Sequence, residues 1–251
     1  MPSSIHPPVA LVTGAAKRIG LAMATHLHQL GYNLIIHYGQ SEALATSQVT
    51  RFNNLRANSA VAISANLTDI EDVHRLAKQS IKEWGQIDVL INNASSFYPT
   101  PFGHIQQEDW TSLVGSNVQG PLFLSQALAD TLKKQQGCII NMVDMHIDRP
   151  LPKHSVYSLA KGALATLTKS LAIEMAPDVR VNGIAPGAIL WPERPLSEQD
   201  KLTMLDSIPM GTLGSCEDIT HAMEYLLGAS YVTGQILYVD GGRGLHTGTP
   251  A

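Results

Sequence analysis

The sequence predicts an α/β protein built on a doubly wound parallel sheet of about seven strands, with helices on both faces. Seven short runs rich in Val and Ile alternate with segments of helical length along the chain. Nearly continuous apolar runs are typical of parallel strands that are covered on both faces. The 251 residues, of which 44% are hydrophobic and 15% charged, suffice for one large globular domain.

The order of the elements follows from these runs and from the residues that begin and end helices. We expect strands at 9–13, 33–38, 60–64, 88–92, 138–143, 179–185 and 236–240. One helical segment closes at Gly31, and another opens at Asp69 and closes at Gly85. Asp is a common N-cap and Gly commonly ends a helix. Strand–helix alternation of this kind requires right-handed crossovers in a parallel sheet.

The chain shows no internal repeat and no linker that would divide it. We therefore predict one domain over residues 1–251, with flexible tails at 1–8 and 245–251. The connection at 188–210 is long and begins with several prolines. Because connections of this length often cover a binding site, we predict a substrate lid there.

Composition limits the classes of partner. The net charge is −4 and there is no run of Lys and Arg, so we expect a small-molecule ligand and no nucleic acid. No apolar stretch has the length of about 18 residues that spans a bilayer, and the N-terminus does not resemble a signal peptide. Two cysteines suit a reducing compartment, so we expect a cytoplasmic protein without membrane contact. The ten histidines show no metal-binding spacing, so no metal is expected.

Ligands of such sheets bind beyond the carboxyl ends of the strands, and the first of these ends carries a glycine turn. Thr13-Gly14-Ala15-Ala16-Lys17-Arg18-Ile19-Gly20 follows the first expected strand and opens a helix, the context of a phosphate-binding turn. Arg18 stands where such turns usually have a glycine. After the second strand the chain reads His37-Tyr38-Gly39-Gln40-Ser41, without the acid that holds the ribose hydroxyls of NAD. With Lys17 and Arg18 as cations for a 2′-phosphate, we predict NADPH as the cofactor.

A candidate proton donor follows the fifth strand. Tyr157 and Lys161 lie one helical turn apart and share a face of the helix. The ordinary pKa of Tyr is about 10, and a neighbouring ammonium group favours the phenolate. We therefore expect Lys161 to make the Tyr157 phenol a better proton donor.

With these motifs in this order, the chain resembles the short-chain dehydrogenase/reductase family, whose fold is of the Rossmann type, along nearly its whole length. The resemblance rests on the turn at 13–20, on Asn92-Asn93-Ala94, on Asn117, Tyr157 and Lys161, and on Pro186-Gly187. It implies that Lys161 binds the nicotinamide ribose, that Asn117 supports Lys161 through water, and that Pro186-Gly187 lies by the nicotinamide amide.

Two departures point within the family. The serine expected thirteen residues before the tyrosine is Asp144, and an ionised carboxylate would repel the oxyanion that forms on a ketone. Phe97, in a segment Ser95-Ser96-Phe97 where the family has Gly, offers a face for a flat heterocycle. These departures, with Arg18, resemble the pteridine reductase subgroup. That resemblance implies reduction of a dihydropterin or dihydrofolate, stacked between nicotinamide and Phe97, with Asp144 and Tyr157 handling the proton and Arg18 contacting both phosphate and substrate.

The expected site residues fall into three groups, and some belong to more than one. The catalytic residues are Asp144, Tyr157, Lys161 and Asn117. The cofactor-binding residues are Gly14, Lys17, Arg18, Ile19, Gly20, His37, Tyr38, Ser41, Asn66, Leu67, Asn93, Ala94, Ser95, Tyr157, Lys161, Pro186 and Gly187. The substrate-binding residues are Arg18, Ser95, Phe97, Asp144, Tyr157 and Trp191.

Two other functions remain open. The chain can instead be a carbonyl reductase of the same family, acting on 3-oxoacyl thioesters or ketones, although Asp144 speaks against it. A non-catalytic NADP-binding sensor is the third reading, although such proteins commonly lose the tyrosine or the lysine. Small residues on the helix that carries Tyr157 permit close helix pairing, and the family resemblance implies a homotetramer.

Overall fold

The seven strands form one parallel sheet in the order β3-β2-β1-β4-β5-β6-β7. The computed structural model describes residues 6–191 and 195–245. The strands are β1 (Val9–Val12), β2 (Asn33–Tyr38), β3 (Ala60–Ser64), β4 (Val89–Asn92), β5 (Cys138–Met142), β6 (Arg180–Pro186) and β7 (Ile236–Val239). The predicted fold class is confirmed, and every strand boundary lies within about one residue of its expected position.

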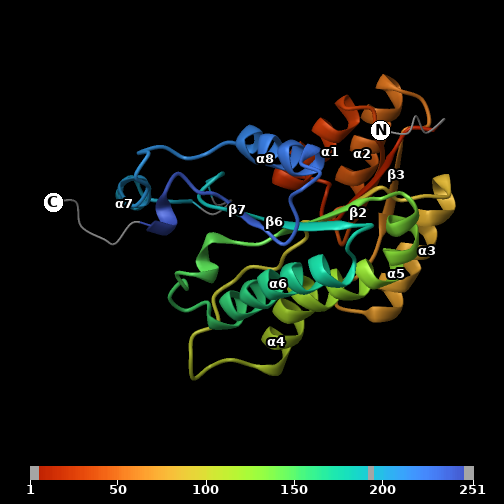
Figure 1. Ribbon diagram of the computed structural model, residues 1–251. Coiled ribbons are helices and arrows are strands. Elements are labelled where there is room, and N and C mark those ends of the chain that lie inside the picture. Colours follow the sequence, from red (N-terminus) through yellow and green to blue (C-terminus); the bar gives the residue numbers. More distant parts are fainter. Residues whose placement is uncertain (1–5, 192–194, 246–251) are drawn as a thin grey trace.

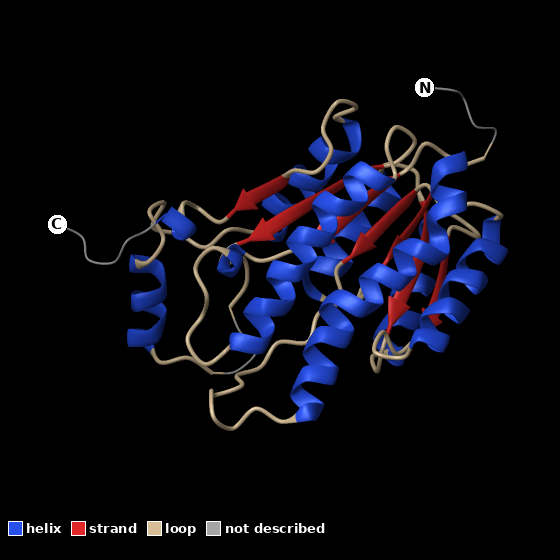
Figure 2. Cartoon of the chain, turned by 60° about the horizontal axis from the view of Figure 1, so that its bottom comes forward, coloured by secondary structure: helices blue, strands red, loops and turns tan. Residues whose placement is uncertain are grey.

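Helices cover both faces of the sheet (Figures 1 and 2). On one face lie α1 (Arg18–Gln29), α2 (Glu42–Leu55) and α8 (Cys216–Gly228). On the other lie α3 (Ile70–Trp84), α4 (Gln107–Val114), α5 (Gly120–Lys134) and α6 (Ser155–Glu174). Three shorter segments also carry site residues: the π-helix η1 (Gly115–Gln119) and the 3-10 helices η2 (Met145–Ile147) and η3 (Arg243–Leu245).

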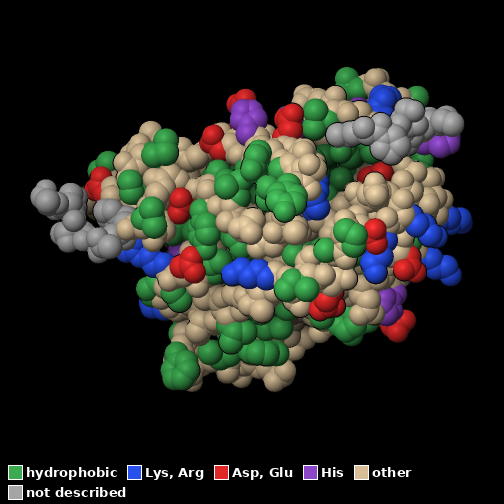
Figure 3. Space-filling view, viewed as in Figure 1, with side chains coloured by type: hydrophobic (Ala, Val, Ile, Leu, Met, Phe, Trp, Pro, Cys, Tyr) green, Lys and Arg blue, Asp and Glu red, His purple; other side chains and the backbone are tan. Residues whose placement is uncertain are grey.

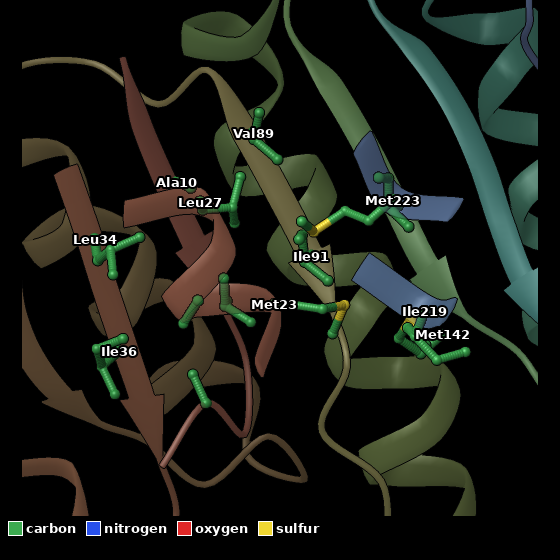
Figure 4. Packing of buried hydrophobic residues seen from close by; sticks show 14 of the residues in the cluster. Ala10, Met23, Leu27, Leu34, Ile36, Val89, Ile91, Met142, Ile219 and Met223 are labelled. Atoms are coloured by element: carbon green, nitrogen blue, oxygen red, sulfur yellow. The ribbon is translucent and has the colours of Figure 1, made fainter. Parts of the chain in front are cut away.

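The two faces of the sheet bury separate apolar clusters, which is why the strands read as continuous apolar runs. On the α1 and α8 side, Met23, Leu27, Ile219 and Met223 pack against strand residues such as Ile91, as the close-up in Figure 4 shows. On the other side, helices α3 and α5 pack against the intervening strand residues, which include Leu11, Ile35, Leu90 and Ile139.

The topology brings the expected functional segments to one edge of the sheet. Strand β1 lies between β2 and β4, so the chain leaves the sheet in opposite directions on the two sides of β1. Ligands bind at such a switch point in sheets of this class. Here the turn after β1 meets the residues after β4, because the backbone N–H of Asn93 donates to Thr13 Oγ1 over 2.9 Å.

Residues 188–210 are more ordered than the word lid suggests. They include α7 (Glu198–Asp206), which buries none of its residues and lies apart from the two helix layers at the left of Figure 1. Ile189 and Ile208 are buried on either side of it. Residues 192–194 of the predicted lid, 1–5 of the predicted N-terminal tail and 246–251 of the C-terminal tail lie outside the described residues. Pro8, still within the predicted tail, accepts a backbone hydrogen bond from Asn33 over 2.8 Å.

Two searches of the described residues concern other ligand classes. None of the described helices is long and apolar enough to cross a membrane. Within 6–191 and 195–245, no three His, Cys, Asp or Glu side chains are grouped so that they could hold a metal ion. On the face that Figure 3 shows, basic and acidic side chains are interspersed.

Candidate active site

The glycine turn after β1 is held by very close contacts. Gly14 adopts φ +63°, a conformation that glycine adopts without steric cost. A Cβ on Gly20 would lie 2.3 Å from the carbonyl oxygen of Gly14 and 2.5 Å from Asn93 Nδ2. Asn93 Nδ2 in turn donates to the Thr13 carbonyl over 2.8 Å. Both glycines are therefore required for the turn to pass so close to the start of α1.

Arg18 occupies a position with a glycine-like backbone. Its φ is +54°, so the chain keeps a side chain where a glycine would be free of strain. The side chain is exposed at the start of α1, and its Nη2 donates to the Trp191 carbonyl over 3.3 Å. The guanidinium therefore reaches from the glycine turn to the beginning of the predicted lid.

A groove of about 650 Å³ runs from the turn across the ends of β2 and β3 to the residues after β4. It is lined by Gly14, Gly39, Gln40, Asn66, Leu67, Ala94 and Ser95, among others. The volume and the mixed polar lining suit the adenosine half of a dinucleotide. Several residues that the sequence places on the cofactor therefore share one continuous groove.

His37 lies at the floor of this groove as a buried, neutral side chain. Its Nδ1 accepts a hydrogen bond from the Gly14 backbone N–H over 3.1 Å, and Nε2 lies 3.1 Å from the Ala65 carbonyl. Burial lowers its pKa to about 4, against smaller raising effects from the hydrogen bond to Ala65 and the charge of Asp72. His37 thus fixes the turn relative to β2 and β3 and carries no charge toward a phosphate at neutral pH.

Asp144, Tyr157 and His146 form a hydrogen-bonded chain beyond β5. The Tyr157 hydroxyl donates to Asp144 Oδ2 over 2.6 Å. His146 Nδ1 lies 2.6 Å from Asp144 Oδ1, and its backbone N–H donates to the same oxygen over 2.8 Å. Burial raises the pKa of Asp144, but the hydrogen bond and charge of His146, with the Tyr157 hydroxyl, bring it below its usual value. Asp144 is therefore ionised at neutral pH.

The expectation that Lys161 makes the Tyr157 phenol more acidic is wrong in this structure. Burial and the adjacent Asp144 carboxylate raise the pKa of Tyr157 far above its ordinary value. Lys161 is buried, its Nζ donates to the Met142 carbonyl over 2.7 Å, and it lies 5.8 Å from the centre of the Tyr157 ring. Burial lowers the pKa of Lys161 itself to about 8, against the charge of Asp144. The nearer charge on Tyr157 is negative.

Asn117 lies in the π-helix η1, an irregularity that often marks functional sites. Its Nδ2 donates to the carbonyls of Leu113 (2.9 Å) and Ser96 (3.0 Å), and its Oδ1 accepts from the Ser95 hydroxyl (2.8 Å). Asn117 therefore holds the segment after β4 in place. No hydrogen bond joins it directly to Lys161 among the bonds of the described residues.

Phe97 packs beside the tyrosine and is more than half exposed, with 56% of its surface accessible. Its ring meets the Tyr157 ring edge to face, with 4.8 Å between centres and 75° between planes. One face is stacked on His154 at 4.8 Å and 13°. The rest of this aromatic surface remains open to a flat ligand.

The remaining expected residues lie around these centres. Pro186 ends β6, and the N–H of Gly187 donates to the Val239 carbonyl over 2.9 Å. Ile19 and Tyr38 pack against the core, and Ser41 precedes α2 without a capping hydrogen bond from its side chain. Trp191 meets Arg18 only through its carbonyl in the bonds described.

Sequence reasoning missed the roles of two histidines. His146 was expected to be a polar loop residue, and His154 was not singled out. The signal for His146 was its place two residues after Asp144, since an Asp side chain often accepts the N–H two residues on. No comparable local signal places His154 against Phe97, because that contact joins segments 57 positions apart.

Comparison with known proteins places the chain among reductases. The protein-family model described as enoyl-(acyl carrier protein) reductase matches residues 14–243. Pteridine reductase 1 of Leishmania tarentolae is 36% identical over 288 aligned positions, covering 98% of this chain and 99% of that protein. The 3-oxoacyl-(acyl-carrier-protein) reductase FabG of Staphylococcus aureus is 32% identical over 238 positions, covering 93% and 96%.

Proposed function

Because the chain belongs to the short-chain dehydrogenase/reductase family and is an NAD(P)-dependent reductase, we propose that it reduces a dihydropterin or dihydrofolate to the tetrahydro form with NADPH. The observation that carries the proposal is the 2.6 Å hydrogen bond from the Tyr157 hydroxyl to Asp144. An ionised carboxyl lies where a ketone reductase of this family usually has a serine hydroxyl. The identity of 36% to a pteridine reductase supports the same substrate class.

NADPH, when bound, supplies the hydride, and the groove at the switch point fits its adenosine half. Ser41 has no capping bond to the start of α2, so its hydroxyl and the free N–H groups there suit the 2′-phosphate. Lys17 and Arg18 are exposed at the start of α1 on the neighbouring turn. Gly39 and Gln40, which line the groove beside them, bring no negative charge. These features support NADPH over NADH.

The proton is handled by this chain's own residues. Tyr157 holds a phenol proton between Asp144 and the exposed edge of Phe97. A pterin ring carries N–H groups that donate to a carboxylate, and a ring nitrogen that accepts a proton when hydride arrives at the adjacent carbon. A ketone offers neither N–H group, and its developing oxyanion would be repelled by Asp144. The site therefore favours a nitrogen heterocycle.

The other substrate and assembly proposals rest on fewer observations. The alternative of 3-oxoacyl reduction is favoured by the 32% identity to the FabG protein and by the family description. A non-catalytic sensor is less well supported, since Asn117, Tyr157 and Lys161 are all present at the site. We also propose a cytoplasmic homotetramer, for which the exposed Leu159 (52%) and Ile173 (80%) on α6 offer an apolar contact face.

The test is to follow NADPH oxidation by its absorbance with the purified protein and four substrates in parallel: dihydrobiopterin, dihydromonapterin, dihydrofolate and an acetoacetyl thioester. We expect turnover with at least one pterin or folate and little with the thioester. Turnover with the thioester alone would contradict the proposal and favour the carbonyl reductase. NADPH binding without turnover of any of the four would favour the sensor.

A further inference from the structure

His146 is held against Asp144 by the local fold as well as by its side chain. Asp144 precedes the 3-10 helix η2 in extended conformation, and its side chain accepts the backbone N–H of His146 over 2.8 Å. This short loop turns the imidazole back toward the carboxylate that caps it. Ring atom Nδ1 then lies 2.6 Å from Asp144 Oδ1. The contact therefore follows from the loop itself and does not depend on a distant element.

The two oxygens of Asp144 have different partners. Oδ1 is bound by His146 through two groups, and Oδ2 accepts the Tyr157 hydroxyl over 2.6 Å. Rotation of the carboxylate about its Cβ–Cγ bond would break contacts on both sides at once. Only 20% of the Asp144 side chain and 16% of the His146 side chain are accessible, so water does not readily replace these partners.

The hydrogen bonds also fix the tautomer of the imidazole. An ionised carboxylate only accepts hydrogen bonds, so the Nδ1 atom facing Oδ1 carries the proton. Among the groups that lower the pKa of Asp144 against the effect of its burial, the hydrogen bond and charge of His146 come before the hydroxyl of Tyr157. Without His146 the buried carboxylate would lose its main stabilising partner and would shift toward the protonated form.

We propose that His146 is a positioning residue that orients the Asp144 carboxylate toward Tyr157, so that His146, Asp144 and Tyr157 act as one hydrogen-bonded unit. The proposal rests on the proposed role of Asp144 and Tyr157 in proton transfer. It does not depend on which substrate accepts the proton. A histidine that orients a carboxylate, and so a phenol, mirrors the way a carboxylate orients a histidine in other catalytic chains.

The test is a double-mutant cycle. His146→Ala, Asp144→Asn and the double variant are compared with the wild type for kcat, KM and NADPH affinity, using a substrate that the wild type reduces. We expect His146→Ala to lower kcat roughly ten- to hundredfold, as loss of an orienting partner does elsewhere. NADPH affinity should stay within about twofold. In the Asp144→Asn background the same change should lower kcat less than about twofold, because His146 acts through Asp144.

Two further variants separate orientation from general damage. His146→Asn keeps a side-chain N–H donor near Oδ1 and should restore most of the kcat that His146→Ala loses. His221→Ala removes a comparable histidine–carboxylate contact, to Glu217 at 3.7 Å on the exposed face of α8, and should leave kcat unchanged. Equal losses from His146→Ala in both backgrounds, or wild-type turnover in His146→Ala, would overturn the proposal.

A readout without turnover keeps this inference distinct from the proposed function. The Nδ1 proton of His146 should give a low-field proton NMR signal that is absent in His146→Ala and moves upfield in Asp144→Asn. If the wild type reduces none of the substrates, the proposed function fails, and this signal still tests the pairing. A His146 signal that Asp144→Asn does not move would overturn the pairing.

Discussion

Replacing Arg18 by glycine should stabilise the protein and impair it at the same time. Arg18 has φ +54°, and this left-handed conformation costs a residue with a Cβ about 1–2 kcal/mol. Glycine removes that cost but adds about 0.4–1 kcal/mol of unfolded-state entropy. The lost contact, a 3.3 Å bond from exposed Arg18 to the Trp191 carbonyl, contributes little. The balance is a gain of roughly 0–1 kcal/mol, which corresponds to a rise in Tm of about 0–4 °C.

The functional loss should be larger than the gain. A charge-assisted hydrogen bond to the substrate is worth about 1.5–3 kcal/mol, so Arg18→Gly should weaken pterin binding roughly ten- to hundredfold, with NADPH affinity reduced less. Tm is measured by calorimetry and KM by NADPH oxidation. Arg18→Ala is the matched control, because it loses the guanidinium but keeps the strained Cβ: it should match the loss without the gain in Tm. A fall in Tm of several degrees in Arg18→Gly, or unchanged pterin KM in both variants, would refute this reasoning.

Three further predictions concern the proton donor, the cofactor groove and its buried histidine. Tyr157→Phe should lower kcat at least about a hundredfold with nearly unchanged NADPH affinity, measured by fluorescence titration, because only the donated proton is lost; unchanged turnover would contradict its acid role. Ser41→Glu should raise the KM for NADPH about tenfold or more and that for NADH much less, since a carboxylate would meet only the 2′-phosphate. Burial keeps the pKa of His37 near 4, below its ordinary value of 6.5, so only the unfolded chain gains this proton as pH falls between these values. Stability should therefore fall by up to about 3 kcal/mol over that window. Urea unfolding of a His37→Asn variant should show a shallower fall, and an equal fall in both proteins would count against it.

The sheet could be predicted almost completely from the sequence because its signals are local. Continuous Val- and Ile-rich runs identify strands buried on both faces, and helix ends are coded by single residues. Asp69 caps α3 by accepting the N–H of Glu71, and Gly85 closes the same helix with φ +76°. The spacing of thirteen residues between Asp144 and Tyr157 similarly anticipated a contact that the structure has at 2.6 Å.

The electrostatics of the site could not be predicted in the same way. One helical turn between Tyr157 and Lys161 places them on a shared face, but it does not say where the ammonium points. Lys161 is directed to the Met142 carbonyl, and the phenol faces Asp144 instead. The sign of the pKa shift on Tyr157 depends on those long-range distances. The neutral state of His37 likewise depends on burial between three separate segments.

The central claim is that a carboxylate at position 144 directs the enzyme to a pterin, and an exchange of Asp144 for serine tests it most directly. The measurement is kcat/KM for dihydrobiopterin and for an acetoacetyl thioester, in the wild type and in Asp144→Ser. We predict that the wild type prefers the pterin and that Asp144→Ser lowers the ratio of the two values at least about tenfold. An unchanged ratio, or full pterin turnover in Asp144→Ser, would contradict the account.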